Sequence, residues 1–394
     1  MLLLSVLFVA STLGVLHSYV VYPTLVRWAA ARRSRTLPVG PGNSSWPPVT
    51  VVMAVHNEAT VLPEKLRSLA AQDYPGPLHY RFGSDVSTDA TDRLLEAFCA
   101  SRPAGTCTTV RNAVRRGKPA TVNDLVLTPG RPEGILLLTD ASVVLLPDTI
   151  RELVRPMVDD PRMGVTDARV HHTGTDTGEI SHLEDRYIRG EVALKEAESR
   201  LFGRFTGPFG GCWALRSHLF AAVPDNYLVD DFYLCMQAYA AGYGGYSAPR
   251  AAVREGVGQR LVDEFRRKRR IGAGNWQNLA HFRTLWWPPY RDGFAFAFFS
   301  HKVLRWLSPL LLLTGAGSLL GLLVATGNYW ATAGVLLLMV AAVTTVPALR
   351  YFAAMNAALL LGLIDYVNGI ETNVWQPSHR HPQDESDRDP RETE

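Results

Sequence analysis

The chain divides into long uncharged apolar runs near its two ends and short apolar runs within a polar middle. Residues 2–26 contain no Asp, Glu, Lys or Arg, and a bilayer-spanning helix needs about 20 apolar residues. Two more such runs cover 306–326 and 330–349, so we expect a transmembrane helix in each of these three places. A fourth run, 351–364, is shorter and ends at Asp365, which favours an interfacial or re-entrant segment.

Basic residues flank the three runs at the ends that would face the same side of a membrane. Arg27 and Arg32 follow the first run, Lys302 and Arg305 precede the second, and Arg350 follows the third. Because Lys and Arg concentrate on the cytosolic side of membrane helices, this pattern places the middle of the chain in the cytosol. A cleaved signal peptide is the alternative for the first run, but no basic residue precedes its apolar core. We therefore expect a retained anchor and an integral protein of the plasma or inner membrane.

The middle of the chain alternates short apolar runs with helix-like periodic segments. Buried strands are predicted at 49–55, 78–82, 108–111, 135–138 and 163–170. Between the first two, Leu62, Leu66 and Leu69 share one face of a predicted helix. Longer helices are predicted at 182–200 and 231–241. The alternation predicts an α/β fold, with a doubly wound and mostly parallel sheet inserted between transmembrane helices.

These patterns also set the expected domain boundaries. They are an anchor (1–26), a linker (27–48), a cytosolic α/β domain (49–278), a membrane-interface segment (279–303), a C-terminal transmembrane region (304–370) and a polar tail (371–394). The linker is rich in Pro, Gly and Ser from residue 36 onward. The interface segment is assigned from its aromatic residues at 286–290 and 294–299, which are typical of the headgroup level.

Composition narrows the class of partner. The mean hydropathy of +0.01 is high for a chain that is 20% charged, in keeping with a membrane protein. A net charge of +3 and a pI of about 8.6 are too mild to indicate nucleic acid, which we exclude as a partner. Cys99, Cys107, Cys212 and Cys235 lack the C-x-x-C spacing of metal sites, so we expect reduced thiols.

Charged residues follow the predicted strands at the points where ligands bind in open parallel sheets. These residues are Glu58, Asp85, Lys118, Asp140 and, at a predicted helix start, Asp231. A cationic run at 266–270 follows, and the first strand lacks the G-x-G-x-x-G turn of dinucleotide binders. Carboxylates can bind a base, a ribose or a metal, and cations can neutralise a diphosphate. Such a mixture suits a nucleotide-diphosphate ligand and a hydroxyl nucleophile.

Six short motifs give the chain a recognisable resemblance. In chain order they read VVMAVHNE, GSDVSTDATD, RRGKPATVNDL, LLTDASVVL, LVDDFYL and RRKRRIGAGN. In order and spacing, over about residues 47–277, the chain resembles the membrane-bound family 2 glycosyltransferases of GT-A fold, the branch that includes cellulose and hyaluronan synthases. The resemblance implies transfer of a sugar from a nucleotide-diphosphate donor, with a UDP-sugar as the first expectation, and a Mg²⁺ or Mn²⁺ cofactor.

The resemblance also implies roles on the donor side. Glu58 and Asp85 would contact the nucleoside, and Lys118 the base or the diphosphate. Asp140 would face the ribose or hold the metal, and Arg270 would bind the diphosphate.

On the acceptor side, Asp231 would be the general base of an inverting reaction, and the helix dipole at its position would hold its pKa low. Asp230 is the alternative base. Gly207, Pro208 and Phe209, together with Asp230, would line the acceptor side.

The chain departs from the family pattern at three positions. Ser142 stands where the family has the second Asp of its D-x-D motif, so the metal would depend more on phosphate oxygens. Arg267 and Ile271 replace the Gln and Trp of the Q-x-x-R-W motif, which leaves processive synthesis open.

Two classes of function follow from this pattern. The first is an inverting glycosyltransferase of the hexosyltransferase type at the cytosolic membrane face. It would act on a glycan or a lipid acceptor in the synthesis of envelope polysaccharide or glycolipid. The second is a non-catalytic membrane subunit that binds nucleotide sugar or a partner synthase. Because so few spans cannot easily form a polymer channel, an exporter partner or a homo-oligomer is also expected.

Overall fold

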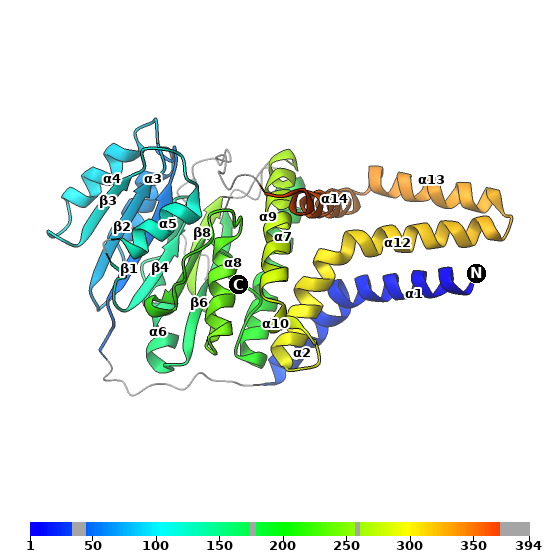
Figure 1. Ribbon diagram of the computed structural model, residues 1–394, viewed down its shortest axis with the longest axis horizontal. Helices are drawn as coiled ribbons and strands as arrows, with labels where there is room; N and C mark the ends of the chain where they lie inside the picture. The colour runs from blue at the N-terminus through cyan, green and yellow to red at the C-terminus, as the bar shows by residue number, and fades with distance from the viewer. Residues whose placement is uncertain (34–44, 129, 174–178, 257–260, 371–394) are drawn as a thin grey trace.

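The computed structural model describes residues 1–33, 45–128, 130–173, 179–256 and 261–370. An α/β domain occupies one half of the molecule, and a group of apolar helices extends from its side (Figure 1). The upright helices α7 (Glu179–Phe202) and α9 (Leu261–His281) lie between these two parts. Half of the predicted linker, residues 34–44, and the whole polar tail lie outside the described residues.

One sheet of eight strands organises the α/β domain, in the order β3-β2-β1-β4-β7-β6-β8-β5. The strands are β1 (Val49–Val55), β2 (Leu78–Ser84), β3 (Cys107–Arg111), β4 (Ile135–Thr139), β5 (Val143–Leu145), β6 (Met163–Thr173), β7 (Cys212–Arg216) and β8 (Gly244–Gly256). Strands β3, β2, β1 and β4 run parallel to one another, as do β6 and β8. Strand β7 runs antiparallel between β4 and β6, and β5 runs antiparallel to β8. The predicted mostly parallel α/β sheet is confirmed, and β5, β7 and β8 were not predicted.

The apolar runs form central strands because both faces of the sheet are covered. All seven residues of β1 are buried. Val51 and Met53 pack on one face with Leu62 of α3 (Leu62–Ala70), whereas Val52 packs on the other face with Leu125 of α5 (Lys118–Leu127). Alternate side chains of one strand therefore enter two separate cores.

The helices of the α/β domain are α3 (Leu62–Ala70), α4 (Thr91–Ala100), α5 (Lys118–Leu127), α6 (Thr149–Asp159), α8 (Asp230–Ala240) and the short α10 (Arg283–Trp286), in addition to α7 and α9. Of these, α3, α7 and α8 lie close to the predicted positions, whereas α10 was not predicted. Leu62, Leu66 and Leu69 of α3 are buried as their spacing predicted. The cationic run 266–270 lies inside α9, a helix that the sequence reading had not placed.

Three helices are long and apolar enough to cross a membrane among the residues that the structure describes. The first, Leu2–Arg32, joins α1 (Leu2–Leu16), the π-helical turn η1 (His17–Val21) and α2 (Tyr22–Arg32). The second, Gly293–Ala325, joins α11 (Gly293–Phe298), the π-helical turn η4 (Phe299–Val303) and α12 (Leu304–Ala325). The third is α14 (Pro347–Asn368), and the shorter apolar α13 (Tyr329–Thr345) precedes it. The first two helices extend beyond the predicted runs because helical structure continues into their polar flanks.

The fourth apolar run, 351–364, lies within α14. Figure 1 shows α14 nearly end-on, whereas α1, α12 and α13 run side by side across the view. It packs closely on α9: a Cβ on Gly362 would lie 2.5 Å from the carbonyl oxygen of Arg269. Asp365 accepts two hydrogen bonds from Arg269, at 2.6 and 2.7 Å. These contacts fasten α14 to α9, and the interfacial placement expected for this run stays a prediction.

Two expectations about side chains are wrong. Cys99 and Cys107 form a disulfide rather than two free thiols, because the turn between α4 and β3 brings their Cα atoms to 5.1 Å. Cys212 and Cys235 are free and buried, as expected. Phe294 and Phe298 are also buried, in the core beneath α8, rather than exposed at headgroup level.

Candidate functional site

A cavity of about 1130 Å³ opens at the carboxyl ends of β1 and β4 and extends toward the apolar helices. Its walls include the predicted donor-side residues Glu58, Lys118, Asp140 and Arg270, together with Asp231. Pro208, Phe209 and Asp230 from the predicted acceptor side also line it. Segments far apart in the sequence therefore meet at one cavity, as the strand-end argument required.

Lys118 and Asp140 form an ion pair within this cavity. The Nζ atom of Lys118 donates to Oδ1 of Asp140 at 2.6 Å. Burial by itself would lower the pKa of Lys118, but Asp140, Asp230 and Asp231 together raise it. Lys118 therefore stays charged and can neutralise an anion beside Asp140.

Asp85 is fully buried and is not among the residues that line the cavity. Its carboxylate accepts hydrogen bonds from the backbone N–H groups of Arg116 and Gly117, each at 2.9 Å, and from Nδ2 of Asn112 at 2.9 Å. Burial raises the pKa of Asp85, but these hydrogen bonds lower it overall. Asp85 thus holds the loop that carries Lys118, and its contact with a nucleoside stays a prediction.

Lys65 is a supporting residue that the sequence reading missed. It is fully buried on α3, where it donates to Oγ1 of Thr139 and to the carbonyl oxygen of Val143, both at 2.6 Å. Burial lowers its pKa to about 8. Lys65 therefore braces both ends of the turn that presents Asp140. Its position beside three leucines on an apolar helix face was the available signal.

Asp230 and Asp231 begin α8, with backbone support at its first turn. The backbone N–H of Phe232 donates to Oδ1 of Asp231 at 2.7 Å. Burial, followed by the neighbouring charge of Asp230, raises the pKa of Asp231 to about 7. The expectation of a low pKa at this helix start is therefore wrong, because burial outweighs the helix dipole. A carboxylate with this pKa suits a general base near neutral pH.

The acceptor-side loop contacts Asp231 through a glycine. Gly210 has a positive φ of 92°, and a Cβ there would lie 2.2 Å from Oδ2 of Asp231. Gly207 also has a positive φ, of 94°, and it packs closely against the ring of Phe232. Glycine at these two positions lets the loop approach the carboxylate closely.

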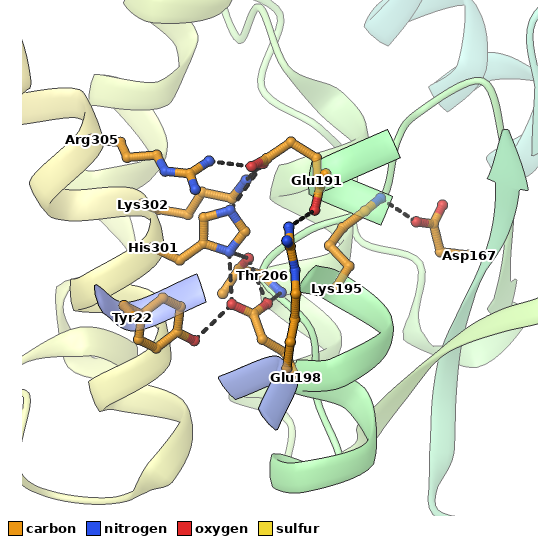
Figure 2. Close-up of polar contacts among 11 residues, drawn as sticks. Tyr22, Asp167, Glu191, Lys195, Glu198, Thr206, His301, Lys302 and Arg305 are labelled. Carbon is orange, nitrogen blue, oxygen red and sulfur yellow. Dashed lines mark hydrogen bonds and ion pairs between the residues drawn. The ribbon is translucent and has the colours of Figure 1, made fainter. Parts of the chain in front are cut away.

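A buried polar network lies behind this loop, and Figure 2 shows its groups converging from three parts of the chain. Glu198 of α7 accepts hydrogen bonds from Tyr22 of the N-terminal helix at 2.8 Å and from Oγ1 of Thr206 at 2.9 Å. His301 of η4 places Nδ1 at 2.7 Å from Glu198 and Nε2 at 2.9 Å from Glu191. The network therefore ties two apolar helices to the residue that begins the acceptor-side loop.

Further ion pairs extend this network (Figure 2). Lys302 and Arg305 both pair with Glu191, and Lys195 pairs with Asp167 at 2.5 Å. The other oxygen of Asp167 accepts from the backbone N–H of Phe209 at 3.0 Å, within the acceptor-side loop. Lys195 of α7 therefore supports Phe209 through Asp167, and α7 also carries the glutamates that contact the apolar helices.

The cationic run on α9 serves more than one purpose. Arg270 lines the cavity and donates to the carbonyl oxygen of Leu228 at 2.9 Å, just before α8. Arg267, which replaces the family's Gln, pairs with Glu184 and Glu264, each at 2.9 Å. Arg270 is therefore placed to meet an anion, whereas Arg267 joins α9 to α7.

The described residues contain no group of three or more His, Cys, Asp or Glu side chains that could hold a metal by themselves. Asp140 and Ser142 nevertheless both line the cavity. Mg²⁺ is commonly held by one or two carboxylates with substrate phosphates and water. The oxygen donors present therefore fit a cation that is shared with a bound diphosphate.

Known proteins agree with this geometry. The family model described as Glycosyl transferase family 2 matches residues 50–223, which include the motifs from β1 to β7. The chain is similar to the mannosyltransferase PcManGT from Pyrobaculum calidifontis, solved in complex with GDP-Man and Mn²⁺, with 24% identity and a TM-score of 0.70. That match covers 92% of this chain and 99% of the other. The predicted resemblance to family 2 glycosyltransferases is therefore confirmed over residues 50–223, and the α/β domain has the predicted GT-A-like fold.

Other solved structures are more distantly similar. Residues 1–349 of S. aureus TarS in complex with UDP share 16% identity at a TM-score of 0.40, covering 69% of this chain and 80% of that one. GalNAc-T7 with UDP, GalNAc and Mn²⁺ shares 14% identity at a TM-score of 0.45, covering 66% and 50%. No curated protein sequence matches the chain.

Proposed function

We propose that the protein is an inverting glycosyltransferase that moves a hexose from a nucleotide-diphosphate donor to the hydroxyl of a glycan or lipid acceptor at the cytosolic membrane face. One observation carries the proposal: Asp231 shares a cavity with the Lys118–Asp140 pair and Arg270. A base for the acceptor thus lies beside groups suited to a diphosphate. The similar mannosyltransferase solved with GDP-Man is consistent with such a donor.

Donor binding assigns separate tasks to the cavity residues. Glu58 and the loop held by Asp85 contact the nucleoside, and Asp140 faces the ribose or the cation. Lys118 and Arg270 neutralise the diphosphate as the glycosidic bond breaks. Mg²⁺ or Mn²⁺ at Asp140 would supply additional positive charge to the leaving diphosphate.

Asp231 acts on the acceptor. Its carboxylate takes the proton of the acceptor hydroxyl as that oxygen attacks the anomeric carbon from the face opposite the diphosphate. A carbon–oxygen bond forms, the bond to the diphosphate breaks, and the configuration inverts. Pro208 and Phe209 confine the acceptor beside this carboxylate.

A donor screen tests the proposal. Purified full-length protein is incubated with UDP- and GDP-hexoses, with Mg²⁺, Mn²⁺ or EDTA, and nucleotide diphosphate release is measured. We expect release with at least one donor and an inverted linkage in the product.

A non-catalytic subunit that binds nucleotide sugar is the second candidate, favoured by Ser142 and by the altered Q-x-x-R-W region. Binding of a nucleotide without turnover, with every donor and a membrane extract as acceptor, would support this second function instead.

A further inference from the structure

The cavity that contains Asp231 does not end in the α/β domain. Its wall continues along Trp306 of α12 and then Phe352, Met355 and Leu359 of α14. The same space is therefore bounded by a catalytic carboxylate at one end and by helices long and apolar enough to cross a membrane at the other.

The volume and lining of this space indicate more than a donor site. Pockets for small ligands commonly occupy about 300–1,000 Å³. At about 1130 Å³, this cavity exceeds that range, so a second substrate can share it with the donor. Trp306 of α12 with Phe352, Met355 and Leu359 of α14 forms an apolar stretch of the wall, in which Asn356 is the polar neighbour, and apolar surface is stabilised by an apolar occupant.

Charged residues lie between the Asp231 end of the cavity and its apolar end. Glu191, Lys302 and Arg305 all line the cavity, and both cations pair with Glu191. Arg305 directly precedes Trp306 on α12, so polar and apolar walls meet within one helical turn. A ligand that fills the whole space thus needs a polar part beside Asp231 and an apolar part beyond Trp306.

The apolar wall is held in place rather than loosely apposed. Asn356 accepts from Ser308 of α12 at 2.6 Å, and Tyr19 of η1 lies 3.2 Å from the same hydroxyl. These contacts join three helices around the apolar end. Together with the Arg269–Asp365 pair, they keep α14 beside the cavity.

We infer that the acceptor is lipid-linked, with its reactive hydroxyl at Asp231 and its hydrocarbon chain along α12 and α14. The inference rests on the proposed function and selects one of its two acceptor classes. A soluble glycan would leave the apolar end without a matching surface, whereas a single-chain lipid satisfies both ends. Entry from the bilayer also follows from the helices that form this wall.

Photo-crosslinking tests the inference without requiring turnover. The probe is hexadecyl glucoside with a diazirine in its tail, added to full-length protein in phosphatidylcholine nanodiscs. We expect adducts on the α14 peptide that contains Met355 and Leu359, competed by unlabelled hexadecyl glucoside but not by ethyl glucoside. Met355→Trp should lower this labelling at least fivefold by filling the apolar end.

Two further variants distinguish a blocked lipid site from a folding defect as the cause of lower labelling. Ala348 also lines the cavity but is exposed, so Ala348→Trp should reduce labelling with little strain on packed contacts. Leu337 on α13 is 70% exposed and is not among the cavity residues, so Leu337→Trp should leave labelling unchanged. Nucleotide diphosphate affinity should stay unchanged in all three variants.

Equal labelling of α13, no competition by the long-chain glucoside, or full labelling in both cavity variants would overturn the lipid assignment. Competition by ethyl glucoside at equal concentration would overturn it too, in favour of a headgroup or glycan site. Because crosslinking needs no donor, a failed donor screen with specific labelling would reject the transferase while leaving the lipid site established.

Discussion

At the scale of single residues, the partners of a buried or half-buried carboxylate decide what chemistry it can do. Asp231 and Asp85 are both carboxylates of the α/β domain, yet their pKa values move in opposite directions. Asp231 lines the cavity beside the carboxylate of Asp230, whereas the fully buried Asp85 accepts several hydrogen bonds. The first is therefore suited to taking a proton and the second to holding a loop.

Replacing Asp231, the proposed base, should abolish most turnover. Asp231→Asn keeps the shape and removes the basicity, so we expect kcat to fall by roughly 10²–10⁴-fold with donor affinity little changed. Because the base must be ionised and its pKa is raised to about 7, activity of the wild-type protein should rise as the pH increases through about 7. Asp230→Asn is the matched control and should have a much smaller effect on kcat. The reverse order of effects would identify Asp230 as the base.

Removing the loop support should weaken nucleotide binding. In Asp85→Ala the N–H groups of Arg116 and Gly117 lose their acceptor, so we expect a loss of roughly 1–3 kcal/mol in affinity for the nucleotide diphosphate, measured by calorimetry. Asp124→Ala is the control, because it breaks only the exposed pair with Arg116 and should cost under about 1 kcal/mol. An unchanged dissociation constant in Asp85→Ala would reduce Asp85 to a turn residue without influence on the site.

At the scale of elements, buried polar contacts join helices that the sequence keeps far apart. Helix α7 presents Glu191 and Glu198 to η4, and Tyr22 reaches Glu198 from the N-terminal helix (Figure 2). Such charges are stable in the interior only while they remain paired. The orientation of the apolar helices and that of the acceptor-side loop are therefore coupled.

Breaking this network should be costly. His301 is fully buried between two carboxylates, so His301→Ala should destabilise the protein by roughly 3–5 kcal/mol, seen as a lower Tm in detergent. Arg111→Ala, which removes an exposed pair with Glu96, is the control and should change stability by less than about 1 kcal/mol. A Tm for His301→Ala as high as that of the control would show that the network does not hold the helices together.

At the scale of the whole molecule, the proposed topology gives the two substrates different routes. In this proposal a nucleotide-sugar donor reaches the cavity from the cytosol, whereas the inferred lipid acceptor reaches it from the bilayer. Disulfides are rare in cytosolic domains, and the α/β domain contains the Cys99–Cys107 disulfide. The side of the membrane on which this domain lies should therefore be tested directly.

Accessibility in intact cells or oriented vesicles checks this arrangement. The positive-inside pattern leads us to expect a reporter at Arg102 in the cytosol and one at Asn328, between α12 and α13, outside. A reporter at Arg102 that is reached from outside would remove the cytosolic glycosyltransferase from consideration. The outcome at Asn328 independently tests whether α12 crosses the membrane.

The sequence by itself determined the elements whose signals are local. Strand β1 and the buried face of α3 follow from apolar periodicity over a few residues, and they lie where that pattern predicted. The strand-end positions of Glu58 and Asp140 follow from the same pattern, because a parallel sheet brings its carboxyl ends to one edge.

Only the tertiary structure decided features that depend on distant neighbours. The antiparallel β7 is short and has no turn signal that marks its partner, so its place between β4 and β6 arises from packing. The raised pKa of Asp231 and the bracing role of Lys65 depend on burial, which residue spacing does not measure. The extension of the cavity to α14 likewise requires α9 and α14 to pack together, although many residues separate them in the chain.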